Sequence, residues 1–353
     1  MTEITRKPRC FVHNDGHNLF YRQIKMVNPA AGIDTAIGMS LHMILYSMKK
    51  EFVKWSGTHA VFYLEGRSWR KDIYPDYKAQ RKVTFAQQSP KEQEDHHILV
   101  EAFDDLANYL TEKTNITVLQ NPKAEADDMI SVFIEAHPAD QHVLVSSDSD
   151  FYQLLRFPNV KIYDPVKDIM ITQEGIFDDD GNRLEFTITP KAKIKVGKQN
   201  ADFVCDPDWY NYALFLKCIR GDDTDNIFSA YPGIREKGTK STVGIREAYN
   251  DSNNKGYSWN NFMLQKFLYH DGTEHRVRDD YLRNKQLIDL SEIPINIKEE
   301  SLAIISNSVQ NKNISSLEIG HHFLKFCGRW DLKRIGDNAS QFLPMLKASY
   351  EKI

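Results

Sequence analysis

The 353-residue sequence has no long apolar run and few cysteines. No stretch approaches the roughly 20 apolar residues that a membrane span requires. The N-terminus carries no apolar signal-peptide core, so we expect a cytoplasmic protein without a membrane partner. The four cysteines are scattered and form no C-x-x-C pair, which argues against a zinc knuckle or a disulfide framework. A Gly-x-Ser-x-Gly elbow is also absent, so nothing indicates a nucleophilic serine.

The sequence also has no large excess of positive or negative residues. The chain has 45 Lys and Arg against 49 Asp and Glu, a formal net charge of −4. This balance argues weakly against nucleic-acid binding. The argument fails if the acids gather around metal ions, because bound cations reverse the local charge. The length is enough for one large domain or two modest ones.

Acidic residues follow several short apolar runs that we predict to be buried strands. Asp15 follows the first run, Glu65 follows the second, and Asp148 and Asp150 follow the fourth. Open α/β sheets build their sites at the carboxyl ends of strands. A single Asp in such a place is more often a helix cap, here with Ser149 or Asp150 as the expected cap. The runs are 9–13, 58–64, 116–119, 142–145 and 160–163.

Helical spacing of apolar residues predicts long helices over 33–55 and 91–111. A third helix begins near Glu125, with Asp127 and Asp128 in its first turn. One or two acids there stabilise a helix through its dipole. Three within four residues repel one another without a cation, which favours a metal site.

Residues 67–82 are rich in Arg and Lys interleaved with Trp and Tyr. Such a mixture suits phosphate contact combined with base stacking, as in proteins that bind single-stranded nucleic acid. A solvated charged loop explains the composition equally well, and composition alone does not decide between them.

Two further segments have turn signals. Residues 177–203 contain Asp178-Asp-Asp-Gly181-Asn182, and we predict a protruding hairpin there. A helix over 208–220 is followed by a Gly-bounded turn at 231–240, between two predicted helices. A helix-hairpin-helix turn of this kind presents backbone N–H groups to a phosphate. Glycine also marks ordinary helix ends.

Taken together, these motifs resemble the phage and bacterial 5′ nuclease family, which contains flap endonucleases, phage RNase H enzymes and the 5′-exonuclease domain of DNA polymerase I. The resemblance extends over roughly residues 9–290. The motifs that carry it are Asp15, the acid after the second strand, Tyr77-Lys78-x-x-Arg81, Glu125-x-Asp127-Asp128, Asp148-x-Asp150, Gly221-Asp222-x-x-Asp225-Asn226 and Pro232-Gly233-Ile234.

The resemblance implies an α/β fold: a three-layer, PIN-like nuclease domain over residues 1–205 with a mostly parallel central sheet. A helical arch at about 67–95 and the inserted hairpin at about 177–203 belong to this domain. A helix-hairpin-helix region would occupy 206–298. The segment 299–353 is not assigned a role.

Matching positions give a site of nine acids that would hold two or more Mg²⁺ ions, with Mn²⁺ as a substitute. Lys78 and Arg81 would act on the scissile phosphate together with Asp148 and Asp150, and Tyr77 would stack on a base. The metal ligands would be Asp15, Glu65, Glu125, Asp127, Asp128, Asp148, Asp150, Asp222 and Asp225. The nucleic-acid contacts would be Arg70, Tyr77, Lys78, Arg81, Gly233, Lys237, Gly238 and Lys240.

Two positions depart from the family pattern. Glu65 stands where the family usually has Asp, so its side chain is longer by one methylene. Arg235 replaces the second glycine of the Gly-Ile-Gly hairpin, which leaves open whether a potassium ion binds there.

The function implied is a structure-specific, metal-dependent 5′ nuclease of phage replication. It would act as a monomer on branched or nicked DNA and on RNA–DNA hybrids, with a clamp or single-stranded-DNA-binding protein as a partner that the sequence leaves open. Two alternatives remain: an inactive nucleic-acid-binding scaffold, and a PIN-type single-stranded ribonuclease without a helix-hairpin-helix region.

Overall fold

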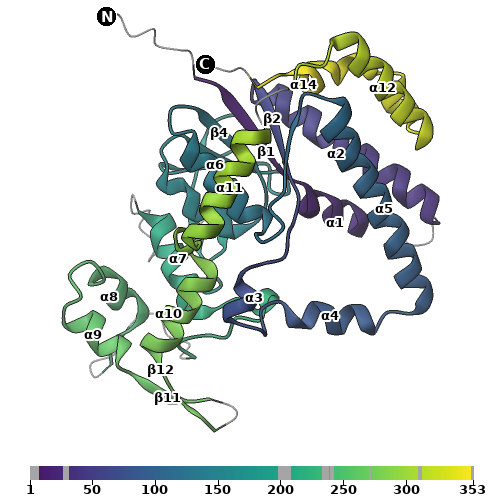
Figure 1. Ribbon diagram of the computed structural model, residues 1–353. Helices are drawn as coiled ribbons and strands as arrows, with labels where there is room; N and C mark the ends of the chain where they lie inside the picture. Colours follow the sequence, from purple (N-terminus) through teal and green to yellow (C-terminus); the bar gives the residue numbers. More distant parts are fainter. Residues whose placement is uncertain are drawn as a thin grey trace, which may run out of the picture.

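The computed structural model describes residues 8–26, 32–197, 208–232, 238, 242–269, 272–308 and 312–350 (Figure 1). An eight-stranded sheet with the order β3-β2-β1-β4-β5-β6-β7-β8 forms its centre. The first five strands in this order are parallel, and the last three are antiparallel. The strands are β1 (Cys10–Asp15), β2 (His59–Tyr63), β3 (Thr117–Leu119), β4 (Gln141–Val145), β5 (Val160–Asp164), β6 (Ile169–Thr172), β7 (Gly175–Phe177) and β8 (Arg183–Leu184).

The strand order reverses between β1 and β4. The chain adds β2 and β3 on one side of β1, then returns to place β4 and β5 on the other side. In doubly wound sheets, ligands bind in the crevice outside the carboxyl ends of the strands at such a reversal. Asp15 ends β1 and Asp148 follows β4, so both acids flank this crevice.

Helices cover both faces of the sheet, which explains why its strands are continuous apolar runs. Along β1, Phe11 belongs to one apolar cluster and Val12 to the other, because successive side chains point to opposite faces. The first cluster includes residues of α6 (Ala126–Ala136), α7 (Trp209–Arg220) and α11 (Ile295–Ser308). The second includes residues of α1 (Gly16–Met26), α2 (Ile33–Lys54) and α5 (Pro90–Lys113).

The predicted strands and long helices are found within a few residues of their expected bounds. Glycine permits a tight turn, which is the expectation for Gly16 directly after Asp15, but this residue begins α1 instead. A Cβ atom there would lie 2.5 Å from the Phe62 ring and 2.8 Å from the Tyr63 carbonyl oxygen. Glycine is therefore required because α1 packs closely on β2.

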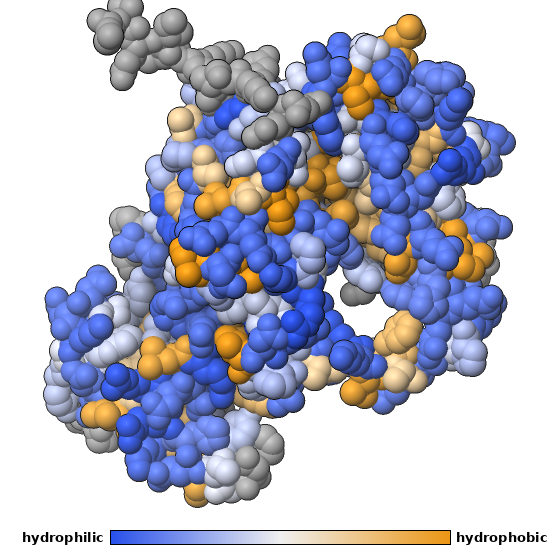
Figure 2. Space-filling view, in the orientation of Figure 1, coloured by the Kyte–Doolittle hydropathy of each residue, from blue (hydrophilic) through white to orange (hydrophobic). Residues whose placement is uncertain are grey.

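A bridge of helices connects β2 to α5. It consists of α3 (Arg70–Ile73), α4 (Ala79–Ala86) and the first turns of α5, which begins with a capping box between Ser89 and Glu92. Figure 2 shows an open passage between this bridge and the body of the molecule. The bridge occupies the segment predicted to form a helical arch.

The predicted protruding hairpin at 177–203 needs correction. β8 joins the main sheet, and a separate antiparallel hairpin is formed by β9 (Phe186–Ile188) and β10 (Ile194–Val196). Phe186, Ile188 and Ile194 are buried in the core, so this hairpin is anchored along one face. Residues 198–207 lie outside the described residues.

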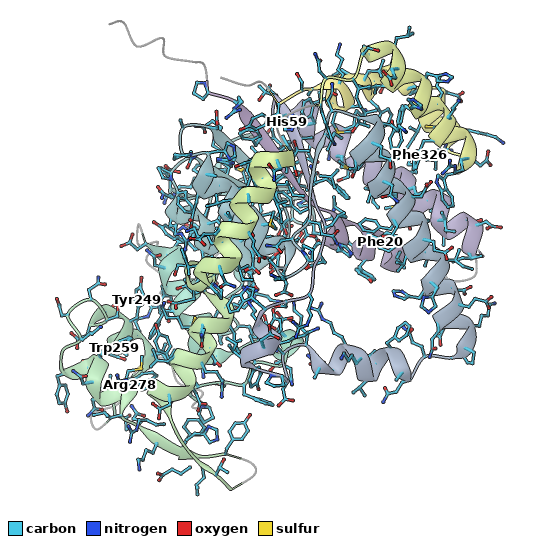
Figure 3. The ribbon with its side chains drawn as sticks, in the orientation of Figure 1. Phe20, His59, Tyr249, Trp259, Arg278 and Phe326 are labelled. Atoms are coloured by element: carbon cyan, nitrogen blue, oxygen red, sulfur yellow. The ribbon has the colours of Figure 1, made fainter. Side chains whose placement is uncertain are left out.

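A smaller lobe contains α8 (Ile245–Asn250), α9 (Tyr257–Met263) and the hairpin β11 (Lys266–Leu268) and β12 (Glu274–Arg276). Tyr249 and Trp259 lie in this lobe (Figure 3), where both contact Phe215 of α7. α10 (Val277–Ile288) leads from the lobe back to the sheet domain.

The C-terminal segment packs on the sheet domain. The predicted boundary at 298/299 falls inside α11, so it does not separate two units. Phe326, labelled in Figure 3, stacks on Tyr109 of α5 at 4.5 Å. The Asn115 amide donates to the Leu346 carbonyl at 2.8 Å, and Nδ1 of His59 lies 2.8 Å from the Ala348 carbonyl oxygen. The segment contains α12 (Ser316–Arg329), α13 (Lys333–Gly336) and α14 (Leu343–Lys347).

Among the helices that the structure describes, none is long and apolar enough to span a bilayer.

Candidate metal and nucleic-acid site

A large open cleft lies at the carboxyl edge of the parallel strands. Basic side chains from the α3–α4 bridge, the β9–β10 hairpin and α7 line it together with acids. Every predicted metal ligand except Asp128 lines this cleft: Asp15, Glu65, Glu125, Asp127, Asp148, Asp150, Asp222 and Asp225.

The backbone fixes three of these acids where the strands end. Asp15 Oδ1 accepts a hydrogen bond from the Asn18 amide at 3.0 Å. Asp148 accepts from the Asp150 amide at 3.0 Å, so Asp148 caps the 3₁₀ helix Ser149–Arg156, rather than Ser149 or Asp150 as expected. Glu65 Oε2 accepts from the Ala126 amide at 3.2 Å, which its extra methylene allows it to reach.

Three acids have raised pKa values, because nearby cations do not fully offset the burial and mutual repulsion that disfavour their charged forms. Burial raises the pKa of Asp15 to about 6, and the charge of Asp148 adds to the effect. Burial and the neighbouring charges of Asp15 and Glu125 raise the pKa of Glu65 to about 7. Burial, together with Asp15 and Asp148, raises the pKa of Asp127 well above its ordinary value. A bound cation would relieve this cost.

Two lysines form ion pairs with four other acids, although burial still raises the pKa of one of them, Asp225. Lys217 pairs with Asp150 and lies 2.9 Å from Asp222 Oδ2. Lys78 pairs with Glu125 and lies 3.7 Å from Asp225 Oδ2. Burial opposes ionisation of Glu125 and Asp222. In Glu125, the Lys78 and Arg70 charges outweigh burial and lower the pKa to about 2; in Asp222, the Lys217 charge also lowers the pKa to about 2.

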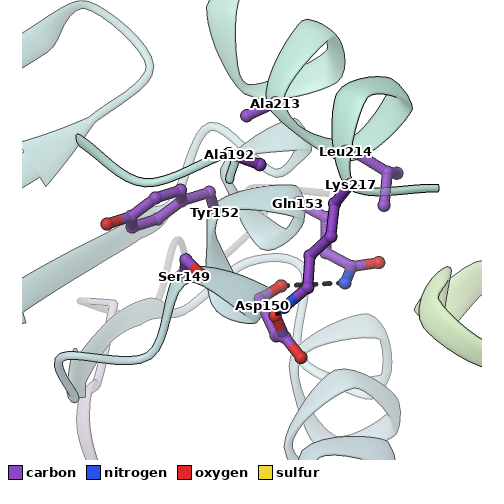
Figure 4. Close-up of a pocket in the computed structure, with 8 residues that line it drawn as sticks. All are labelled: Ser149, Asp150, Tyr152, Gln153, Ala192, Ala213, Leu214 and Lys217. Atoms are coloured by element: carbon purple, nitrogen blue, oxygen red, sulfur yellow. Dashed lines mark hydrogen bonds and ion pairs between the residues drawn. The ribbon is translucent and has the colours of Figure 1, made fainter. Parts of the chain in front are cut away.

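Lys217 was not identified from the sequence. It lies on α7, amid aromatic and aliphatic residues, and five positions before Asp222. Figure 4 shows its side chain reaching from α7 to Asp150 beside Gln153. The signal in the sequence was one lysine within the otherwise apolar run 214–219.

The prediction that Asp128 binds metal is wrong in this geometry. Asp128 is completely buried, and Arg70 binds both of its oxygens, at 2.8 and 2.9 Å. Oδ2 also accepts from Trp69 Nε1 at 3.0 Å. The predicted nucleic-acid contact of Arg70 is wrong for the same reason, since this residue is 3% exposed and its guanidinium also bonds to Glu125 and the Leu287 carbonyl.

The predicted base-stacking role of Tyr77 also fails. Its ring is buried against Ile227, Leu287 and Ile288. Its hydroxyl donates to Glu125 at 2.9 Å and lies 3.1 Å from Asp225. Tyr77 therefore positions acids of the cleft and presents no open face to a base.

Cations of the cleft differ in how fully they are engaged. Arg81 is largely exposed and pairs with Asp225 at 3.0 Å. Arg22, which was not identified from the sequence, reaches the cleft from α1. In the described part of the chain, Nη1 of Arg22 is buried without a hydrogen-bond partner. Burial lowers the pKa of Arg22 despite the nearby charges of Asp164 and Asp15. The signal in the sequence was its spacing, one helical turn after Asn18 on the helix that follows Asp15.

The donor set fits a hard divalent cation, because it consists of carboxylate oxygens, the ligands that Mg²⁺ and Mn²⁺ prefer. Over the described ranges, no three His, Cys, Asp or Glu side chains lie close enough together to hold an ion as they stand. Ion pairs with Lys78 and Lys217 hold four of the acids in their present positions. Metal binding would therefore require side chains of this cleft to rearrange.

A pH dependence follows from the raised pKa values. The unfolded chain releases the protons of Asp15 and Glu65 near pH 4, whereas the folded cleft keeps them to about pH 6 and 7. Folding of the metal-free protein is therefore penalised increasingly as the pH rises through this window.

In EDTA, the melting temperature of Asp15→Asn should exceed that of the wild type at pH 7.5 and match it near pH 4. Added Mg²⁺ should raise the melting temperature of the wild type more than that of the variant. An equal difference at both pH values would show that Asp15 carries no such penalty.

Of the residues predicted to contact nucleic acid in the helix-hairpin-helix turn, the structure describes only Gly238. Gly233, Lys237, Lys240 and Arg235 lie outside the described residues. The Gly238 amide donates to both carboxylate oxygens of Glu247, each at 3.1 Å. Its N–H is thus engaged within the protein and not directed at a phosphate.

Comparisons with known proteins agree with this architecture. Residues 12–181 match the family model of the 5′-3′ exonuclease, N-terminal resolvase-like domain. DNA polymerase I of Rhizobium leguminosarum is 29% identical over 194 residues, which cover 54% of this chain and 15% of that protein. Ribonuclease H of Enterobacteria phage T4 is 24% identical over 201 residues, 55% of this chain and 54% of the relative. Flap endonuclease Xni of Shewanella pealeana is 29% identical over 164 residues, which cover 45% of this chain and 57% of that relative.

The chain thus spans about half, or much less, of the length of these curated relatives. Among solved structures, bacteriophage T5 flap endonuclease in complex with DNA and metal ions superposes with a TM-score of 0.55 at 17% identity. That match covers 86% of this chain and all of the T5 chain. T5 5′-exonuclease with zinc bound gives the same TM-score, and that match covers 85% of this chain and 99% of the T5 chain. These likenesses establish the fold, and residues 12–181 are similar to the N-terminal resolvase-like domain of 5′-3′ exonucleases.

Proposed function

We propose that this protein is a structure-specific 5′ nuclease that depends on divalent metal ions. It hydrolyses phosphodiesters at 5′ ends or flaps of DNA, and removes RNA primers from RNA–DNA hybrids. We place it, as a monomer, in the cytoplasm of a phage-infected cell, where it would serve DNA replication.

One observation carries this proposal: the cleft at the strand reversal combines uncompensated acids with cations from the α3–α4 bridge. Asp15, Glu65 and Asp127 have raised pKa values, which favours a cation among them. Lys78 and Arg81 line the same cleft. An acid cluster alone would repel nucleic acid, and a basic patch alone would not cut it.

Asp15, Glu65, Asp127 and Asp148 would hold the metal ions, with Glu125, Asp150, Asp222 and Asp225 as further ligands once their lysines move. Bound divalent ions activate water and stabilise the charge of the phosphate that is being cut. The carboxylates would position the ions.

The cations of the chain would act on the phosphate. Lys78 and Arg81 stabilise charge that builds on its oxygens in the transition state. Arg22 would bind a phosphate oxygen, because it lines the cleft and its Nη1 has no hydrogen-bond partner among the described residues. The open passage beside α4 offers a route for a single-stranded 5′ end (Figure 2).

The proposal is tested with three 5′-labelled substrates of one sequence: a 5′-flap duplex, a nicked duplex and an RNA–DNA hybrid. Cleavage near the junction or the 5′ end is expected in Mg²⁺, and none in EDTA. Binding of the flap without cleavage of any substrate, in either Mg²⁺ or Mn²⁺, would identify the protein as an inactive scaffold. Cutting of single-stranded RNA alone would favour the PIN-type alternative.

Lys78→Ala and Arg81→Ala should each reduce the single-turnover cleavage rate by about 100-fold, the range typical of removing a charge-stabilising donor. Affinity for the flap should change much less, because these side chains act mainly in the transition state. Lys325→Ala, on the exposed face of α12, is the matched control. Equal losses of rate and affinity would make Lys78 and Arg81 simple phosphate clamps.

A further inference from the structure

The β9–β10 hairpin presents a row of lysines at the edge of the cleft. Lys191, Lys193 and Lys195 are exposed, while the intervening Ala192 and Ile194 are buried. Side chains alternate along a strand, so Lys193 and Lys195 point the same way, with Cα atoms about 6.6 Å apart. Lys191 and Lys193 line the same cleft as the acids.

The hairpin is held rigidly relative to those acids. Phe186 packs edge-on against Trp209 at 5.2 Å, and Trp209 also contacts Tyr152 at 5.6 Å. In Figure 4, Ala192 at the hairpin tip lies close to Tyr152 and Ala213, beside the Asp150–Lys217 pair. The same helix, α7, therefore supports the lysine hairpin and carries Lys217.

The turn itself is well defined. The Ala192 amide donates to the Thr189 carbonyl at 2.8 Å, and the Thr189 amide donates to the Lys193 carbonyl at 2.8 Å. The Lys193 amide also donates to Thr189 Oγ1 at 3.1 Å. Ala192 has a φ of 57°, and its side chain is nevertheless buried. These hydrogen bonds fix where the neighbouring lysines emerge.

The protein neutralises these lysines poorly. Lys191 lies 3.2 Å from Asp223, but both side chains are about four-fifths exposed, so the pair contributes little. Within the ranges that the structure describes, neither Lys193 nor Lys195 has a carboxylate within ion-pair distance. Lys217, in contrast, is buried between two acids. The hairpin lysines are therefore available to an external anion.

We propose that the β9–β10 hairpin is a phosphate-binding clamp, with Lys191, Lys193 and Lys195 gripping the phosphodiester backbone of the nucleic acid in the cleft. This inference rests on the proposed function. The clamp would line the same cleft as Lys78 and Arg81 of the α3–α4 bridge, so that both groups of cations could contact the strand to be cut. It offsets the repulsion between those acids and the substrate.

The test is the salt dependence of binding. A triple variant, Lys191→Gln, Lys193→Gln and Lys195→Gln, is compared with the wild type on a fluorescent 5′-flap duplex in EDTA, by anisotropy from 50 to 300 mM KCl. Removing one lysine–phosphate interaction should flatten the slope of log K against log salt by about 0.9 for duplex DNA, or about 0.7 for a single strand. Removing two or three of them should weaken binding by at least about tenfold at the lowest salt.

The matched control removes the same charge from exposed lysines of the C-terminal helices: Lys325→Gln, Lys333→Gln and Lys347→Gln. It should keep the wild-type slope. If the hairpin variant has the slope and affinity of this control, the clamp is refuted. A loss of single-turnover rate without a loss of affinity would also refute it, because a clamp acts on binding. Failure of the wild type to cleave in Mg²⁺ would refute the proposed function. The salt dependence of binding would still show, independently of cleavage, whether the hairpin lysines bind phosphate.

Discussion

Asp127→Asn is expected to reduce Mg²⁺-dependent cleavage by about 1,000-fold and leave the protein folded. Asp127 lines the cleft, and burial together with Asp15 and Asp148 raises its pKa well above normal. A thousandfold loss corresponds to about 4 kcal/mol of transition-state stabilisation, a magnitude that a misplaced metal ion can account for. Single-turnover kinetics on the flap duplex measure the rate.

Stability provides the second measurement on this variant. Removing one of several repelling carboxylates should raise the melting temperature in EDTA at pH 7.5. A control that removes acids elsewhere, Asp331→Asn with Asp337→Asn in exposed turns of the C-terminal segment, should change neither quantity. A variant at Asp127 that cuts near the wild-type rate would remove this residue from the site.

The neighbouring substitution, Asp128→Asn, is expected to have the opposite effect on stability. Asp128 is fully buried and binds both terminal nitrogens of Arg70, which is itself buried. Asn at this position removes one of the two carboxylates that pair with Arg70 and leaves only Glu125. Breaking a buried ion pair of this kind costs about 3–5 kcal/mol. Chemical denaturation should therefore show a large drop in the free energy of unfolding, in EDTA as well as in Mg²⁺.

A double variant separates charge from packing. Arg70→Met with Asp128→Leu replaces the ion pair by apolar side chains, and such replacements often restore much of the stability that single variants forfeit. The double variant should be more stable than Asp128→Asn alone. If Asp128→Asn unfolds like the wild type and instead needs more Mg²⁺ for cleavage, Asp128 is a metal ligand after all.

Much of the fold could be predicted because the spacing of apolar residues along the sequence follows the face of a helix or strand that is buried. The apolar residues of α2 at helical spacing, such as Leu41, Ile44 and Met48, are all buried. Acids at strand ends also indicated the cleft, since parallel strands bring their carboxyl ends to one edge. Asp15 and Asp148 are far apart in the sequence but flank the same strand reversal.

The errors concern groups whose partners come from distant elements. Arg70 and Tyr77 have the composition of a nucleic-acid contact, yet their partners Asp128 and Glu125 follow β3. Sequence spacing does not show which cation is paired with an internal acid. The same limitation hid Lys217, whose role depends on contact with Asp150, 67 positions away.

The most direct test of the metal site is an anomalous diffraction map of crystals grown with Mn²⁺. We expect at least one strong peak in the cleft, within bonding distance of two or more of Asp15, Glu65, Asp127 and Asp148, and no peak at Asp128. A protein that cleaves the flap in Mn²⁺ but shows its peaks away from these carboxylates would contradict the assignment of the cleft as the metal site.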